Sequence, residues 1–127
     1  FEEYAKKIND ETIVIAQIEH IDAVNNLEEI LDVHGIDGTI IGPYDLSGSM
    51  GKPGRYDDSE VLEVLQRYEK ISMKAGKPMG YHVVEPNYHL VLEKIKAGYS
   101  FIAFSLDTLF LGSMCRAQLK ELKKNKQ

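Results

Sequence analysis

The chain has 127 residues, about the size of one modest domain, and its net charge of −5 argues against a nucleic-acid backbone as a partner. No apolar run approaches the roughly 20 residues that span a bilayer, so the sequence predicts no membrane partner. The single cysteine, Cys115, can form no internal disulfide, which fits a reducing cytoplasm. We expect Cys115 to be a small core residue of a helix.

The start of the chain, FEEYAKKIND, reads as the end of a helix already under way, and its first residue is Phe1 rather than methionine. We therefore expect this sequence to be a piece of something longer. Beyond it, runs rich in apolar and β-branched residues predict strands at residues 12–18, 38–41, 79–84 and 101–106. The first and last runs are mostly apolar on both faces, which is typical of a parallel strand covered on both sides.

Apolar residues at the 3.6-residue helical spacing follow every predicted strand. In chain order these faces are Ala23, Val24, Leu27, Ile30 and Leu31; Val61, Val64, Leu65, Tyr68 and Ile71; Tyr88, Val91, Leu92 and Ile95; and Leu111, Met114, Cys115, Leu119 and Leu122. Asp58 or Ser59 can cap the second helix. Gly35, Gly76 and Gly98 stand just after helices, where a left-handed residue is favoured.

The resulting order, β-α-β-α-β-α-β-α, implies a parallel sheet with right-handed crossovers. It amounts to half of a (β/α)8 barrel, which typically needs about 250 residues. A free-standing four-stranded α/β sandwich is the alternative, and periodicity alone does not separate the two. The long connection at 46–59 follows a strand end, where α/β folds carry ligand loops.

Two acidic residues stand at neighbouring strand ends, where parallel α/β folds bind their ligands. Glu19 ends the first strand and Asp45 follows the second, so their carboxylates could face each other across a short gap. Such a pair repels unless a cation or a shared proton lies between the carboxylates, and oxygen ligands suit Mg²⁺ or Mn²⁺. Open positions on that cation would suit a 2-oxo acid. Alternatively, each carboxylate merely caps the helix that follows it.

Other residues near the strand ends carry weaker signals. Gly42 allows backbone to approach a ligand, and the amides of the turn that it begins would favour a carboxylate. His82 is a candidate pocket residue because it lies near the end of the third strand. We expect His20 to pack against a helix, and Asp107 to begin the last helix rather than take part in chemistry.

The stretch QIEHIDAVNNLEEILDVHGIDGTIIGPYDLSGSMG resembles the HpcH/HpaI aldolase/citrate lyase family. Within that family it is most similar to the 2,4-dihydroxyhept-2-ene-1,7-dioate aldolase-like and 2-keto-3-deoxy sugar-acid aldolase-like members. The likeness covers essentially all of the chain and is strongest at residues 15–51, at GYHVVEP and at FIAFSLDT. It implies that residues 1–127 are a single partial domain, the C-terminal half of a (β/α)8 TIM barrel of the phosphoenolpyruvate/pyruvate type.

The resemblance also implies an activity. The whole protein would be a class II pyruvate aldolase, a carbon–carbon lyase that reversibly cleaves a 4-hydroxy-2-oxo acid to pyruvate and an aldehyde through a metal-bound enolate. Glu19 and Asp45 would be the ligands of a divalent cation, which would be Mg²⁺, Mn²⁺ or Co²⁺. The residues implied to bind substrate are Gln17, Gly42, Tyr44, Asp45, His82 and Val84.

The family's general-base histidine and the arginine that clamps the keto oxygen belong to the first half of its barrel. No residue of this chain is assignable to either role, so we expect the chain alone to be inactive. The alternative is a truncated, non-catalytic relative that binds metal or keto acid or serves as a structural partner. The resemblance further implies a homo-oligomer in which the last helix can be swapped between subunits.

Overall fold

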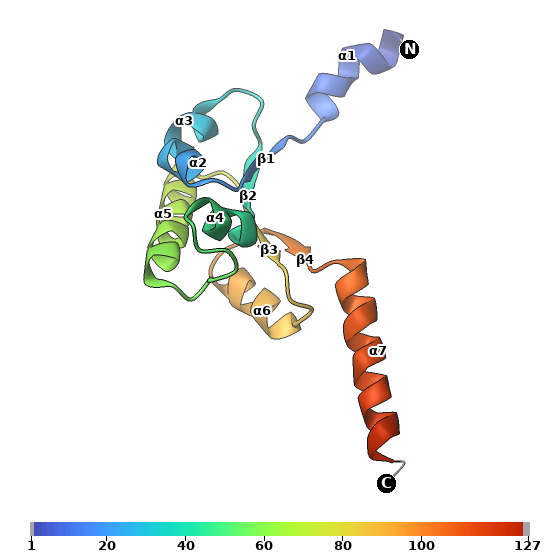
Figure 1. Cartoon of the computed structure of the whole chain (residues 1–127). Coiled ribbons are helices and arrows are strands. Elements are labelled where there is room, and N and C mark those ends of the chain that lie inside the picture. The colour runs from blue at the N-terminus through green and yellow to red at the C-terminus, as the bar shows by residue number, and fades with distance from the viewer. Residues whose placement is uncertain (1, 126–127) are drawn as a thin grey trace.

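The computed structural model describes residues 2–125, apart from the side chains of residues 5, 6 and 9. A helical segment of one or two helices follows every strand along the chain, as predicted (Figure 1). In order they are α1 (Glu2–Glu11), β1 (Ile15–Ile18), α2 (Ile21–Asn25), α3 (Leu27–Asp32), β2 (Gly38–Ile41), α4 (Pro43–Ser49), α5 (Ser59–Ala75), β3 (Met79–Val83), α6 (Tyr88–Lys96), β4 (Phe101–Phe104) and α7 (Asp107–Lys124).

The strands form one parallel sheet in the order β1-β2-β3-β4, so each strand lies beside the next one in the chain. Ile18 pairs with Ile41, and Ile41 pairs with Tyr81, so the carboxyl ends of the strands share one edge. Helices α2–α6 lie to one side of this sheet in Figure 1, whereas α1 and α7 extend away from it. This arrangement confirms the parallel α/β unit and differs from a sandwich with helices on both faces.

The hydrophobic core lies between the sheet and the helices on its covered side. Its buried members are Ile18, Val24, Leu27, Leu31, Ile41, Leu46, Val61, Val64, Leu65, Tyr68, Met79, Tyr81, Val83 and Tyr99. Because side chains alternate along a strand, Gln17 and Ile40 belong to the opposite face of the sheet. Gln17 is exposed and Ile40 is half-buried, so this second face is much less covered.

Helix α5 is held to the sheet by a buried hydrogen-bond network as well as by apolar contacts. The Tyr68 hydroxyl lies 2.9 Å from Oγ1 of Thr39 and 3.3 Å from the Gly80 carbonyl oxygen, which joins α5 to β2 and β3. The ends of α5 follow the sequence prediction. The Asp58 side chain caps its first turn, and Gly76 ends it with a left-handed φ of 67°.

Several boundaries differ from the sequence prediction, and β3 and β4 end at Val83 and Phe104 rather than at residues 84 and 106. The first strand begins at Ile15 rather than at residue 12, because α1 continues to Glu11 and residues 12–14 stay exposed. The helical region after it is interrupted at Asn26 and forms α2 and α3. The first part of the long connection is helical, since α4 begins with Pro43, whose ring presets a helical φ in the first turn.

The predicted core faces of the last two helices are partly wrong. Tyr88, Leu92 and Ile95 of α6 are exposed, whereas Val91 packs on the core as predicted, together with Leu90. Cys115 is also exposed, as are the other apolar residues predicted for its helix. The reason is that α7 extends away from the sheet and, within residues 2–125, has no layer to pack against (Figure 1). None of the described helices is both long enough and apolar enough to cross a membrane.

Candidate metal and substrate site

The candidate site lies where β1 and β2 end. The N–H of Gly42 donates to the Ile18 carbonyl oxygen at 3.0 Å, so the ladder continues one residue beyond β2. This bond brings the backbone of Gly42 beside the turn that carries Glu19. The neighbouring strand ends expected from the sequence are therefore confirmed as neighbours.

The Glu19 side chain is directed by two contacts. The Gln17 amide nitrogen donates a hydrogen bond to Oε1 of Glu19. A Cβ atom added to Gly42 would lie only 3.2 Å from both Cγ and Oε1 of Glu19. The carboxylate is thus directed toward the end of β2, and the glycine leaves the space that this direction requires.

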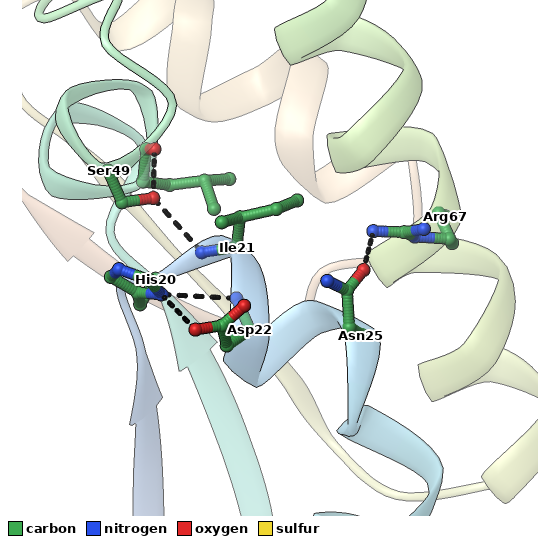
Figure 2. A network of polar contacts seen from close by, with 7 residues as sticks. His20, Ile21, Asp22, Asn25, Ser49 and Arg67 are labelled. Carbon is green, nitrogen blue, oxygen red and sulfur yellow. Dashed lines mark hydrogen bonds and ion pairs between the residues drawn. The ribbon is translucent and has the colours of Figure 1, made fainter.

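Asp45 is exposed in the first turn of α4, three positions after Gly42. Two serines anchor this short helix. Ser47 accepts a hydrogen bond from the N–H of Gly54 at 3.0 Å, and Ser49 accepts one from the N–H of Ile21 at 3.0 Å. Figure 2 shows the second bond, which joins α4 to the start of α2. The turn that follows Glu19 and the helix that carries Asp45 are therefore connected.

The backbone amides around this turn are not equivalent. Gly42 uses its N–H in the bond to Ile18. For the N–H groups of Tyr44 and Asp45, no acceptor is present among residues 2–125. An anion bound at this turn would therefore find its donors at Tyr44 and Asp45 rather than at Gly42. The Tyr44 side chain is 53% exposed and also borders this surface.

His82 and Val84, at the end of β3, line a cavity of about 510 Å³ between that strand, α5 and α6. Gln17, Glu19 and Asp45 do not line it. In the structure, Gln17 and Glu19 thus lie with Gly42 at the ends of β1 and β2. His82 and Val84 line a separate cavity at the end of β3.

Tyr56 is a residue near the site that the sequence analysis missed. Burial, and then the charges of Tyr44, Glu85 and Asp45, raise the pKa of its phenol above the usual range. Tyr56 thus lies within electrostatic reach of Asp45 and also lines the cavity beside His82. Its only signal in the sequence is an aromatic residue inside the polar connection at 46–59.

The expectation that His20 packs against a helix is wrong. His20 is the N-cap of α2, and its Nδ1 accepts a hydrogen bond from the N–H of Asp22 at 3.1 Å (Figure 2). The imidazole stays exposed because a capping side chain must turn back over the open end of its helix. Asp107, by contrast, begins the last helix as predicted.

The donor set at the strand ends fits a hard divalent cation. Glu19 and Asp45 offer carboxylate oxygens, the ligand type that Mg²⁺ and Mn²⁺ prefer. Within the described residues, no group of three or more His, Cys, Asp or Glu side chains could hold a metal. A cation held by these two residues would therefore complete its shell with water or substrate oxygens.

A parallel α/β unit with polar and acidic groups at the carboxyl ends of its strands is the arrangement of (β/α)8-barrel enzymes. The chain belongs to the HpcH/HpaI aldolase/citrate lyase family, whose model matches residues 2–112. It is 34% identical to 2-keto-3-deoxy-L-rhamnonate aldolase of Escherichia coli O6:K15:H31, over 98% of this chain and 46% of that protein.

Solved structures agree with this membership. An HpcH/HpaI aldolase from Desulfitobacterium hafniense DCB-2 matches with a TM-score of 0.85 and 28% identity, over 96% of this chain and 47% of that one. An HpcH/HpaI aldolase/citrate lyase family protein from Burkholderia cenocepacia J2315 matches with a TM-score of 0.88 and 27% identity, over 95% and 46%. The chain thus spans about half the length of the relatives that it matches, and its fold corresponds to half of their barrel.

Proposed function

We propose that this chain supplies the metal-binding half of a class II pyruvate aldolase. The whole protein would reversibly cleave a 4-hydroxy-2-oxo acid to pyruvate and an aldehyde. The observation that carries this proposal is the orientation of the Glu19 carboxylate, which Gln17 and the bare Cα of Gly42 direct toward the strand end preceding Asp45. Family membership and the 2-keto-3-deoxy-L-rhamnonate aldolase relative support the same class of reaction.

In this proposal Glu19 and Asp45 hold Mg²⁺, Mn²⁺ or Co²⁺. When bound, the cation would act as a Lewis acid that polarises the keto oxygen of the substrate. The N–H groups of Tyr44 and Asp45 would bind the substrate carboxylate, because they have no other acceptor among residues 2–125. Gln17 would keep Glu19 oriented toward the cation and border the pyruvyl group.

His82 and Val84 would contact the aldehyde portion, on the strand next to β2. No residue of this chain is proposed as the general base or as the cationic clamp for the keto oxygen. Without those groups, a developing enolate loses proton transfer and much of its electrostatic stabilisation. We therefore propose that the chain alone binds metal but does not turn over, and that the remainder of the barrel supplies both groups.

A non-catalytic relative that binds metal or keto acid is the second candidate. Both candidates include the cation at Glu19 and Asp45. They differ in turnover by the complete protein. The enzyme proposal also includes a cytoplasmic homo-oligomer in which α7 packs on a neighbouring subunit. The exposed side chains of Leu111, Met114 and Leu119 on α7 support this packing.

The test is pyruvate release from a 4-hydroxy-2-oxo acid by the full-length protein, measured with Mn²⁺ and with excess EDTA. We expect EDTA to abolish the rate, and Glu19→Gln and Asp45→Asn each to lower it at least a hundredfold. Asp22→Asn is the matched control because its carboxylate is exposed on α2. A full rate in EDTA or in Glu19→Gln would exclude the metal site, and Mn²⁺ binding without any turnover would favour the non-catalytic relative.

A further inference from the structure

The cavity beside β3 is separate from the candidate metal site. It lies at the carboxyl end of β3, where it is lined by Tyr81 and Val83, which face α5 and α6, and also by His82 and Val84. Gln17, Glu19 and Asp45 do not line the cavity. Its walls are mostly apolar, and they include Pro43, Leu62, Leu65, Val83 and Leu90. Its volume of about 510 Å³ falls in the ordinary range for small-molecule sites, roughly 300–1,000 Å³.

One cation enters this apolar surrounding. Nζ of Lys94 lies 4.1 Å from the centroid of the Tyr81 ring and 5.5 Å from that of Tyr99. Among residues 2–125, no carboxylate lies within 4.0 Å of this nitrogen, and no oxygen accepts a hydrogen bond from it. Burial lowers the pKa of Lys94, against the opposing charges of Glu69 and Glu93. Since half-buried charges are normally paired, this ammonium has an open position for an anion.

Two phenols add hydrogen-bonding capacity. Tyr81 is only 8% exposed, and its hydroxyl has no partner within the described part of the chain. Burial raises the pKa of Tyr81 to about 12, so the hydroxyl keeps its proton at neutral pH and can donate it to an anion. Tyr56 lines the same cavity from the connection that follows α4.

The remaining charged groups limit the charge of a ligand. Asp57, Glu85 and Glu93 also line the cavity, and all of them are exposed. These exposed carboxylates repel phosphates and dicarboxylates more strongly than they repel a single negative charge. The half-buried ammonium of Lys94 then favours one carboxylate, and the apolar walls favour a hydrocarbon body.

We propose that this cavity binds a small monocarboxylate with an apolar body, whose carboxylate contacts Lys94 and the Tyr81 hydroxyl. The ligand body lies against Leu65, Val83 and Leu90. The site is independent of the cation at Glu19 and Asp45, so it accepts ligands in the presence of EDTA. It adjoins the proposed aldolase site through His82 and Val84, which line the cavity, and through Pro43 and Tyr56, which precede and follow the Tyr44–Asp45 turn.

The experiment is calorimetry on the full-length protein in EDTA with 4-methylpentanoate and its neutral amide, 4-methylpentanamide. We expect the carboxylate to bind at least tenfold more tightly than the amide. Lys94→Met, which keeps an apolar stem, should weaken carboxylate binding at least tenfold and leave amide binding unchanged. Lys96→Met is the matched control on the same helix and should bind both probes as the parent does. Equal binding of the two probes, or parental binding by Lys94→Met, would overturn the proposal.

Two further variants keep the outcome decisive. Leu62→Trp keeps the Lys94 ammonium and fills the cavity from α5, so it should abolish binding of both probes. This variant takes the place of Lys94→Met if circular dichroism shows that Lys94→Met does not fold. Unchanged binding in Leu62→Trp would place the probe elsewhere and overturn the proposal. Glu19→Gln should bind the probes normally even if it loses aldolase activity, which separates failure of this site from failure of the proposed function.

Discussion

The Ser49 hydroxyl connects two segments that are far apart in the sequence. It accepts a hydrogen bond from the N–H of Ile21 at 3.0 Å and donates one to the Leu46 carbonyl oxygen at 2.7 Å (Figure 2). Ile21 begins α2, two positions after Glu19, and Ser49 ends α4, which carries Asp45. One hydroxyl therefore sets how the Glu19 turn lies against the Asp45 helix.

Replacing Ser49 by alanine should loosen this connection. The N–H of Ile21 would lose its acceptor in a partly buried place, at a cost of about 1 kcal/mol in the free energy of unfolding. Because the Glu19 turn would then be less constrained, the affinity for Mn²⁺ should fall as well, which calorimetry measures. Ser113→Ala is the control, since the Ser113 hydroxyl only bonds the Phe110 carbonyl oxygen on exposed α7. Equal Mn²⁺ affinity in both variants would contradict the connection.

Gly42→Ala should displace the Glu19 carboxylate. The new methyl would lie 3.2 Å from Cγ and Oε1 of Glu19, closer than ordinary contact, so the side chain must move. We expect Mn²⁺ affinity to fall at least tenfold with only a modest change in thermal stability, because Glu19 is free to turn toward solvent. Calorimetry and a thermal melt of the same sample separate the two effects.

Gly48→Ala provides the matched control for that substitution. A Cβ on Gly48 meets nothing within 4 Å, and the residue lies inside α4. Alanine should therefore stabilise the helix by up to about 1 kcal/mol and leave Mn²⁺ affinity unchanged. If both alanine variants bind Mn²⁺ alike, the contact between Gly42 and Glu19 does not matter for the site.

Much of this fold is predictable because its signals are local. Apolar runs identified every strand, the helical spacing around Val61 identified the core face of α5, and Asp58 marked its beginning. The failures at α6 and α7 share one physical cause. A row of apolar residues on a helix predicts that this face can be buried, but it does not identify the element that buries it. Cys115 was therefore wrongly expected in the core, which α7 does not reach.

The candidate site was predictable only as a set of residues. Strand order places the ends of β1 and β2 side by side in any simple parallel topology, so it brings together the segments that carry Glu19 and Asp45 without coordinates. The contacts that direct the Glu19 carboxylate depend on distances between segments, as does the bond from Gly42 to Ile18. Tyr56 was missed for the same reason, because the sequence of the polar connection at 46–59 does not indicate the direction in which its aromatic side chain points.

An acidic pH should weaken the connection between α4 and α5 through Asp58. Its carboxylate lies 2.6 Å from Nζ of Lys52 and 3.1 Å from the Arg55 guanidinium, and it also caps α5. The hydrogen bond from Lys52 is the main cause that holds the pKa of Asp58 below its usual value. The stabilisation is therefore complete above the unfolded pKa, near 3.9, and is lost as the pH falls through the lower folded pKa.

Asp58→Asn tests this dependence, because asparagine still caps a helix but carries no charge. Urea unfolding should show the variant less stable than the parent at pH 7, with a difference that shrinks as the pH falls below about 4. Asp57→Asn, one position earlier, should show a smaller difference. A penalty for Asp58→Asn that stays constant from pH 7 to pH 3 would mean that the charge contributes nothing.

Ser105 has strained backbone beside Val84, one of the residues that line the cavity at the end of β3. It follows β4 with a φ of 58°, the only positive value among the non-glycine residues described, and its hydroxyl donates to the Val84 carbonyl oxygen at 2.9 Å. Ser105→Ala loses this bond and keeps the backbone strain. Ser105→Gly also loses the bond, but it relieves the strain, which costs about 1–2 kcal/mol for a residue with a Cβ atom. Glycine should therefore be the more stable variant at 105 in urea unfolding. At exposed Ser100 the alanine variant should be the more stable one, because glycine there only makes the unfolded chain more flexible. The same order of stability at both positions would show that the φ of Ser105 carries no cost.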